Sequence, residues 1–214
     1  MARLILLRSA ATAATLRAAF PDDEPLVARG ERDAGALTHV PCLQPRRAGQ
    51  VLTSPALRAR QTAAAAGLDA TVEEALADAD AGAWRGLTLD EVADRDPERL
   101  AAWLEDPDAR PPGGESRRDL LTRVSACLDQ LHTRILGSDS NGDEDQDGGG
   151  IRTGAARGAT VAVTHSGWVR AAALLVLGAP PAAFWRIDIA PASLTVLHRR
   201  ERGWALARVN WTAT

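Results

Sequence analysis

Short runs of aliphatic and β-branched residues alternate along the chain with longer segments of helical periodicity. The runs "RLILL" (3–7) and "TVAVTH" (160–165) have the pattern of strands buried on both faces of a sheet. Further strands are predicted at 51–54, 193–200 and 203–211, and helices at 29–38, 55–66, 88–104, 115–136 and 167–177. This alternation predicts a three-layer α/β/α fold, with helices on both faces of a central, mainly parallel sheet.

Residues 137–159 interrupt this pattern. They are rich in glycine and aspartate and have no apolar periodicity, so we expect a disordered surface insertion there. The chain of 214 residues is long enough for one large core and too short for two comfortable ones. The sequence therefore predicts a single domain over residues 1–214, with the insertion inside it.

Composition excludes several classes of partner. A net charge of -3 gives no reason to expect binding to nucleic acid or to an anionic membrane, and no apolar run approaches the ~20 residues of a membrane span. Cys42 and Cys127 lack the spacing of a metal site, and two isolated thiols are typical of a reducing compartment. We therefore predict a cytoplasmic protein without a metal or cofactor.

Three polar residues stand just after predicted strands. Arg8, Ser54 and His165 each follow an apolar run, and ligands of parallel α/β sheets bind beyond the carboxyl ends of the strands. We expect these segments to converge on one site. All 25 basic residues are arginine, so any positive charge in that site is a guanidinium, which suits bidentate contacts with phosphate or carboxylate.

Five segments carry a resemblance to a known family. They are "LILLRSAATAAT" (4–15), "TSPALRARQTA" (53–63), "ADADAGAWRGLTLDE" (77–91), "GGES" (113–116) and "VAVTHSGWVRA" (161–171). Their order and spacing resemble the histidine phosphatase superfamily, the phosphoglycerate-mutase-like enzymes, over nearly the whole chain. In that family the first strand ends in Arg-His-Gly, and the histidine attacks phosphorus. Two arginines and a second histidine hold the phosphoryl oxygens, while an acid protonates the leaving group.

The resemblance implies a role for four residues of this chain. Arg8 and Arg58 match the two arginines, and His165 matches the second histidine. Asp78, four residues before Gly82, matches the acid, where the family usually has glutamate. These groups would position a phosphoryl group and neutralise the charge on its oxygens.

At the position of the nucleophile, this chain differs from the motif of the family that it resembles. Ser9 stands where the family has its attacking histidine. Ala10 replaces the glycine, Ala11 an acid often found next, and Thr15 an asparagine. Four changes are better explained by divergence than by one inactivating substitution. A serine hydroxyl also needs an activating base, metal or depressed pKa, and in the family the second histidine faces the phosphate from another side.

Each residue also has a plainer interpretation when it is considered alone. Arg8 could pair with a carboxylate, and Arg58 could lie on a solvated helix face. Asp78 could belong to a turn or cap, and His165 could be a hydrogen-bonded core residue. Glu115 could cap a helix. The tryptophans are most simply core or pocket-wall residues, namely Trp84, Trp168 and Trp185.

Three functional hypotheses follow. The favoured one is a protein that binds a phosphorylated or anionic small molecule and lacks efficient phosphohistidine chemistry. The second is an enzyme that uses another route, with His165 and Asp78 as acid and base. The third is a structural or partner-binding protein with a vestigial pocket.

The segments "GAWRGLTLDE" and "FWRIDIAPAS" resemble the small-molecule phosphatase branch, including the α-ribazole phosphate phosphatases of cobalamin synthesis. Neither the ligand nor the oligomeric state follows from the sequence.

Overall fold

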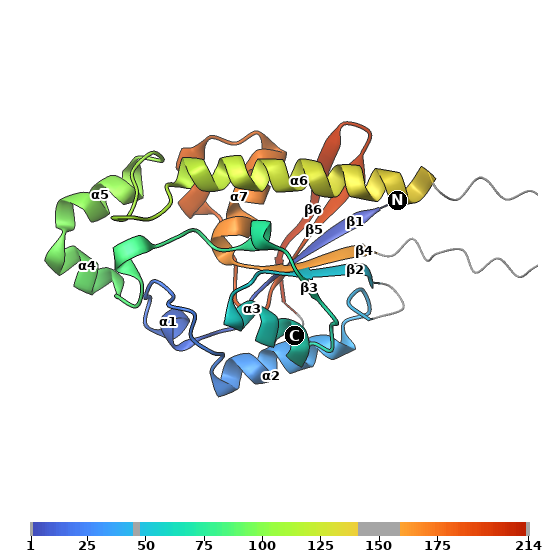
Figure 1. Ribbon diagram of the computed structural model, residues 1–214, viewed down its shortest axis with the longest axis horizontal. Coiled ribbons are helices and arrows are strands. Elements are labelled where there is room, and N and C mark those ends of the chain that lie inside the picture. Colours follow the sequence, from blue (N-terminus) through green and yellow to red (C-terminus); the bar gives the residue numbers. More distant parts are fainter. Residues whose placement is uncertain (1, 45–47, 141–158, 213–214) are drawn as a thin grey trace, which may run out of the picture.

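A six-stranded sheet forms the centre of the computed structural model, which describes residues 2–44, 48–140 and 159–212 (Figure 1). The strand order is β3-β2-β4-β1-β5-β6. The strands are β1 (Arg3–Arg8), β2 (Ala48–Thr53), β3 (Thr71–Val72), β4 (Ala159–Thr164), β5 (Leu194–Arg200) and β6 (Gly203–Trp211). β1 to β4 pair in parallel, whereas β5 is antiparallel to β1 and β6 is antiparallel to β5. The predicted mainly parallel α/β sheet is confirmed.

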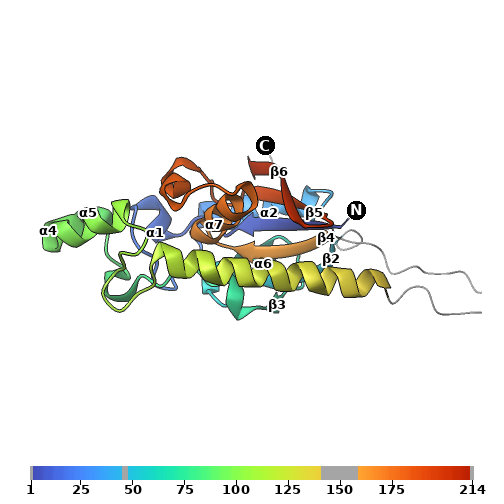
Figure 2. The same ribbon diagram turned by 90° about the horizontal axis from the view of Figure 1, so that it is seen from above.

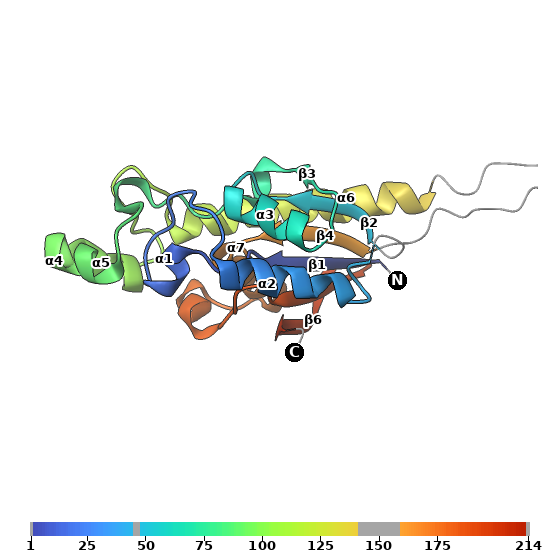
Figure 3. The ribbon, with the colours of Figure 1, turned by 90° about the horizontal axis from the view of Figure 1, so that it is seen from below.

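Helices cover both faces of the sheet, as predicted. The helix α6 (Arg117–Ser140) lies with α7 (Ser166–Leu177) on one face, and α2 (Ala28–Ala36) lies with α3 (Leu57–Ala65) on the other (Figures 1 and 3). The remaining helical segments are α1 (Ala13–Leu16), α4 (Leu89–Arg95), α5 (Pro97–Glu105), η1 (Leu37–His39), η2 (Glu74–Leu76), η3 (Gly82–Trp84) and η4 (Pro181–Arg186).

The alternation of side chains along β1 divides the core in two. Leu4 and Leu6 join the apolar cluster under α6 and α7, and Ile5 and Leu7 join the cluster under α2 and α3. All four are at most 1% exposed. Successive residues of a strand point to opposite faces, so a strand with helices on both sides must be apolar throughout. This explains the continuous run that precedes Arg8.

The predicted helix 88–104 is wrong in one respect, because two helices occupy this segment. α4 ends at Arg95, and α5 begins at Pro97. Proline lacks the backbone N–H that a continuing helix requires, and it disfavours helical backbone at the preceding residue. Asp96 adopts φ -150° and ψ 64°, and its carboxylate accepts a hydrogen bond from Arg99 N. Asp96 therefore ends one helix and caps the next.

The helices α4 and α5 extend beyond the carboxyl ends of the parallel strands (Figure 2). They are held by a small aromatic cluster in which Phe20, Trp84 and Trp103 contact one another with ring centroids 5.2–5.8 Å apart. Trp103 also contacts Trp185 of η4 at 4.9 Å. This cluster therefore ties α5 to the segment after α7, at the end of the sheet where ligands of such folds bind.

The predicted insertion at 137–159 lies mostly outside the described residues, which stop at 140 and resume at 159. Residues 137–140 belong to α6, and Ala159 begins β4.

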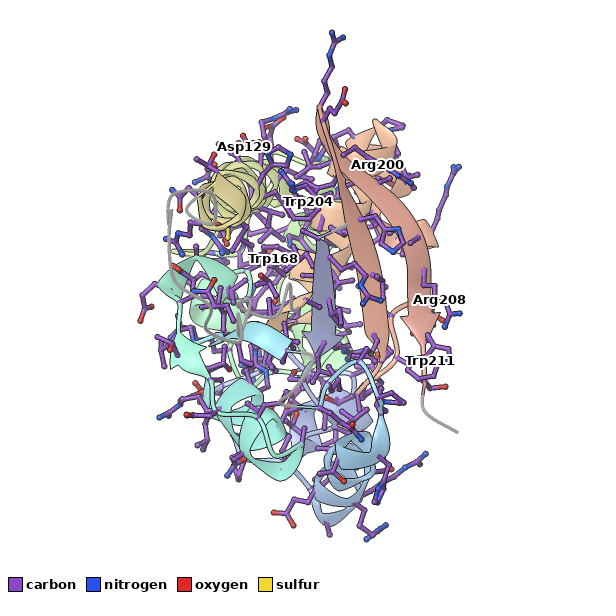
Figure 4. The ribbon with its side chains drawn as sticks, turned by 90° about the vertical axis from the view of Figure 1, so that its right-hand side faces the viewer. Asp129, Trp168, Arg200, Trp204, Arg208 and Trp211 are labelled. Carbon is purple, nitrogen blue, oxygen red and sulfur yellow. The ribbon has the colours of Figure 1, made fainter. Side chains whose placement is uncertain are left out.

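At the far edge of the sheet, Trp204 lies between β6 and α6, and its Nε1 donates to the Leu128 carbonyl at 3.2 Å (Figure 4). In the part of the chain that the structure describes, no helix is long and apolar enough to cross a membrane.

Gly30 in α2 lies directly against the loop that follows β1. A Cβ at Gly30 would overlap the carbonyl oxygen of Ala11 and lie 3.0 Å from its nitrogen, whereas a Cβ at Gly35 would meet nothing within 4 Å. We expect Gly30→Ala to lower the free energy of unfolding by about 1–3 kcal/mol, because backbone atoms must shift. The matched Gly35→Ala replacement should raise it by up to about 1 kcal/mol. Urea unfolding of both variants measures the difference, and equal effects would contradict this close packing.

Candidate functional site: a pocket lined by two arginines

The three strand ends that the sequence indicates do meet. β1 and β2 both pair in parallel with β4, so Arg8, Ser54 and His165 follow neighbouring strands at the same edge. The pocket at this edge is lined by Arg8, Ser9, Arg58, Asp78 and His165, together with residues of α1 and the start of α7. Every residue that the family resemblance assigned to the site therefore lies around one cavity. Arg60, on the same helix as Arg58, is exposed to solvent.

Arg58 and Asp78 form an ion pair at one wall of the pocket. Arg58 Nη2 donates to Asp78 Oδ2 at 3.0 Å, and the two side chains are 8% and 25% exposed. The expectation of a solvated helix face for Arg58 is wrong, because α3 packs this side of its first turn against the sheet edge. Burial would raise the pKa of Asp78, but His165 and Arg58 lower it below its ordinary value. Asp78 is therefore ionised at neutral pH.

His165 is buried between a hydroxyl and this carboxylate. Its Nε2 is 2.7 Å from Ser54 Oγ, and its Nδ1 is 3.6 Å from Asp78 Oδ2. Ser54 Oγ also accepts the Ala56 N–H at 3.3 Å, so its own proton is free to be donated to Nε2. This arrangement favours the tautomer that carries its proton on Nδ1. That atom is buried, has no hydrogen-bond partner in the described part of the chain, and is available to an oxygen of a ligand.

Burial lowers the pKa of His165 to about 4, despite the opposing effect of Asp78. The arginines add to the lowering, because Arg58 and Arg8 repel a charged imidazolium. His165 is therefore neutral at pH 7. It can donate one hydrogen bond and it adds no charge to the pocket.

A pH dependence of stability follows from this shift. Between pH 4 and the ordinary pKa of 6.5, the unfolded chain binds the His165 proton more tightly than the folded protein does. Stability is therefore full above pH 6.5 and is lost as the pH falls toward 4, by about 3 kcal/mol in total. We expect His165→Asn to remove this part of the pH dependence. Urea unfolding at pH 7 and pH 4 measures it, with replacement of the exposed His39 as the control. Identical pH slopes for wild type and His165→Asn would contradict the assignment.

Arg8 is fixed at the end of β1 by the segment before β5. Its Nη1 donates to the Ile189 carbonyl, while Arg170 Nε donates to the Ile187 carbonyl at 2.8 Å. Burial, followed by repulsion from Arg170, lowers the pKa of Arg8 to about 10. The guanidinium remains charged at pH 7. The pocket thus combines the charge of Arg8 and the Arg58–Asp78 pair with the N-terminus of α7, which favours anions.

The backbone around Ser9 is held on both sides. Ser9 N donates to the Thr164 carbonyl at 2.8 Å, and Ala10 N donates to Thr62 Oγ1 at 2.9 Å. Thr62 in turn donates to the Arg58 carbonyl at 2.7 Å. The loop that carries Ser9 is therefore tied to β4 and to the helix that carries Arg58. The imidazole of His165 hydrogen-bonds to Ser54 rather than to Ser9.

Sequence reasoning missed Arg123, which holds the loop of Asp78 in place. From α6, Arg123 donates to the carbonyls of Ala75, Ala77 and Asp78 at 3.0–3.3 Å. It also forms an ion pair with Glu115 at 2.8 Å. The only available signal was the placement of an acid and an arginine two turns apart at a helix start. The expectation that Glu115 caps this helix is wrong, because Ser116 and Asp119 make the capping contacts.

The tryptophans occupy the expected places. Trp168 is fully buried, and its Nε1 donates to the Ala75 carbonyl at 2.9 Å. Trp84 is buried in the aromatic cluster, while Trp185 is 38% exposed and lines a cavity next to the pocket. Within the described ranges, no group of three or more histidine, cysteine, aspartate or glutamate side chains could hold a metal ion.

The fold is that of a phosphoglycerate-mutase-like α/β protein, with an arginine-lined pocket at the carboxyl edge of its parallel strands. The chain belongs to the histidine phosphatase superfamily (branch 1), whose sequence profile matches residues 4–140 and 149–212. This confirms the family indicated by the motifs around Arg8, Arg58 and His165.

Solved structures of similar fold cover nearly the whole chain. A mycobacterial glucosyl-3-phosphoglycerate phosphatase, Rv2419c, in complex with VO3 is 26% identical with a TM-score of 0.77, over 98% of this chain and 99% of that one. The α-ribazole phosphatase from Shigella flexneri superposes with a TM-score of 0.77 over 98% and 96% of the two chains. At 21% identity, the second comparison shows the fold alone.

Curated relatives match over shorter stretches. The bifunctional protein Rv2228c of Mycobacterium tuberculosis is 46% identical over 85 residues, which are 38% of this chain and 23% of that protein. The matched part thus spans about a quarter of the length of that relative. Phosphoserine phosphatase 1 of Hydrogenobacter thermophilus is 27% identical over 157 residues, 73% of this chain and 65% of that protein.

Proposed function

We propose that this protein binds a phosphorylated or otherwise anionic small molecule between Arg8, Arg58 and His165, and that it lacks efficient phosphohistidine-based phosphatase activity. The observation that carries the proposal is that Arg8, Arg58, Asp78 and His165 line one pocket together with Ser9, the residue that the family resemblance places where the attacking histidine belongs. Two of the proteins named above, the glucosyl-3-phosphoglycerate phosphatase and phosphoserine phosphatase 1, are phosphatases of phosphorylated small molecules, which supports a ligand of the same chemical class.

The buried polar atoms of the pocket support binding. Arg8 is charged, and His165 Nδ1 is buried with no hydrogen-bond partner within the described ranges. A buried donor without a partner destabilises the folded state, so an oxyanion that accepts its hydrogen bond would relieve that cost. A pocket retained only as a relic has no physical reason to keep these groups directed at one cavity.

The surroundings of Ser9 support loss of the usual chemistry. The Ser9 hydroxyl needs a base to attack phosphorus, yet His165 is hydrogen-bonded to Ser54. Among the described residues there is no metal-binding cluster to activate it instead. The chain therefore keeps groups that would hold a phosphoryl group and lacks an activated nucleophile at the position that would attack it.

A second candidate function is hydrolysis by another route. The neutral His165 ring lies between two oxygens, with Ser54 Oγ 2.7 Å from its Nε2 and Asp78 Oδ2 3.6 Å from its Nδ1. This is the order hydroxyl, base and orienting acid that serves nucleophilic catalysis elsewhere. Ser54 is fully buried, however, so a substrate would have to reach a hydroxyl that solvent does not. Ester hydrolysis that disappears in Ser54→Ala would favour this candidate.

We also propose that residues 1–214 act as one domain in the cytoplasm. The pairing of β1 with β5 supports the first part, since it joins the beginning and the end of the chain in one sheet. The free thiols of Cys42 and Cys127 support a reducing compartment.

Thermal unfolding with added orthophosphate tests the binding proposal. We expect millimolar orthophosphate to raise the melting temperature by a few degrees, because a ligand that binds only the folded state stabilises it by about 2.7 kcal/mol at a hundredfold excess over its Kd. Arg8→Ala should remove this response, while Arg60→Ala, which alters an exposed arginine, should keep it. The proposal fails if orthophosphate leaves the wild-type melting temperature unchanged, or if Arg8→Ala responds as the wild type does.

A further inference from the structure

A second cavity of about 180 Å³ adjoins the pocket of Arg8 and Arg58. The two cavities share Pro21, Asp78 and Ser166 as lining residues. The second one is bordered by the start of α6, by α7, by η4 and by α5, elements that meet beyond the sheet (Figure 1). A molecule held by its phosphate in the first pocket would extend into this space, so the lining of the second cavity bears on which molecules are bound.

Arg117 in this lining is buried and incompletely paired. The residue is 4% exposed, and its Nε and Nη2 atoms have no hydrogen-bond partner among the residues that the structure describes. Its guanidinium lies over the Trp185 ring, with the central carbon 5.6 Å from the ring centroid. Burial lowers the pKa of Arg117, and Asp106 offsets part of this effect. Buried guanidinium donors are normally satisfied by acceptors, so two free donors indicate an acceptor that comes from outside the chain.

Arg170 brings a second guanidinium to the same aromatic wall. Its central carbon lies 5.5 Å from the Trp185 ring centroid and 5.8 Å from that of Phe184. Its Nε donates to the Ile187 carbonyl, which fixes the orientation of the planar group. Both arginines therefore face one ring system, and the stacking holds them in place without neutralising their charge.

The acids of this cavity already have partners. Asp78 is paired with Arg58 and Glu115 is paired with Arg123. No ion pair joins Arg117 or Arg170 to a carboxylate within the part of the chain that the structure describes. The cavity thus has an excess of positive charge beside an apolar surface formed by Phe20, Trp103 and Trp185.

We propose that Arg117 and Arg170 form a second oxyanion subsite, which binds a carboxylate or a second phosphate on the same molecule whose phosphoryl group lies between Arg8 and Arg58. This proposal rests on the proposed function and narrows it. The preferred ligand is a phosphomonoester with two anionic groups, and its carbon skeleton packs against the aromatic wall. Arg117 determines this specificity through the two donors that the protein itself leaves unused.

Calorimetric titration with three ligands of equal chain length tests the subsite. The probes are propyl phosphate, 3-(phosphonooxy)propanoate and propane-1,3-diyl bisphosphate. We expect at least one of the two doubly anionic ligands to bind wild-type protein about tenfold or more tightly than propyl phosphate, as charge-assisted hydrogen bonds allow. The better of the two identifies a carboxylate or a phosphate as the second group.

Arg117→Gln should abolish that preference and leave the affinity for orthophosphate unchanged. Arg118→Gln is the matched control, because the neighbouring arginine is exposed and paired with Asp108, and it should retain the preference. If wild-type protein binds orthophosphate but binds all three probes with equal affinity, the proposal of a second subsite is overturned, and the proposal of a phosphate-binding first pocket stands. Equal weakening of every ligand in Arg117→Gln would also overturn the second subsite, since that result indicates a general structural role. Absence of orthophosphate binding would instead refute the proposed function. The wild-type comparison decides the matter even if Arg117→Gln does not fold.

Discussion

The variant Ser9→His is expected to hydrolyse simple phosphate esters at least ~10³-fold faster than the wild-type protein. The replacement supplies the nucleophile that the family uses, next to a cavity lined by Arg8, Arg58 and Asp78. A covalent step divides one barrier into two, and the arginines would stabilise the charge of the transferring phosphoryl group. For scale, loss of the nucleophile of a serine protease lowers turnover about 10⁶-fold. We expect less here, because the proposed match to the family motif places Ala10 and Ala11 where the family has a glycine and often an acid.

Initial rates with p-nitrophenyl phosphate and acid-quenched trapping of a phosphoenzyme measure the gain. Ser9→Gln is the control, because it adds comparable bulk without a nucleophile and should stay inactive. A Ser9→His protein that folds and binds orthophosphate but gains no activity would contradict an otherwise intact site. Rapid hydrolysis by the wild type that is lost in Ser9→Ala would establish a serine nucleophile instead.

Arg58→Ala is expected to weaken orthophosphate binding by about two orders of magnitude, the effect of losing a charge-assisted, bidentate contact. It should also lower the free energy of unfolding by about 3 kcal/mol. The second effect arises because Asp78, only 25% exposed, loses its partner at 3.0 Å. Calorimetry gives the binding constant, and urea unfolding gives the stability.

A double replacement separates the two roles of Arg58. Arg58→Ala combined with Asp78→Asn removes the unpaired charge, so it should recover most of the stability and none of the binding. Arg60→Ala, on the exposed face of the same helix, should change neither quantity. Orthophosphate binding that survives in Arg58→Ala would place the anion elsewhere.

The backbone of the site could be predicted because its signals are local. The apolar run before Arg8 predicts a strand buried on both faces, and β1 has that position between two helical layers. The ends of parallel strands share one edge, so Arg8, Ser54 and His165 could be brought together without coordinates. The break between α4 and α5 also has a local cause, Pro97 itself, although the sequence predicts one helix over 88–104.

The side-chain partners could not be predicted, because they join segments far apart in the chain. Ser54 and His165 are 111 residues apart, and Arg123 holds carbonyls 45–48 residues before it. No local pattern specifies which ring nitrogen of His165 is left without a hydrogen-bond partner in the described part of the chain. Nor does one specify that Arg117 is buried with two N–H donors that no described residue accepts. These features depend on the packing of α6 and α7 against the loops, which is a tertiary property. The short strand β3, with only two residues, was also beyond any periodicity argument.

The central claim is that the pocket binds a phosphate ester without turning it over. Phosphorus NMR of the wild-type protein mixed with a small excess of propyl phosphate tests both parts in one experiment. We predict a shifted and broadened ester resonance that returns to its free position in Arg8→Ala, with negligible growth of the orthophosphate signal over hours. An unshifted ester resonance, or rapid conversion of the ester to orthophosphate, would contradict this account.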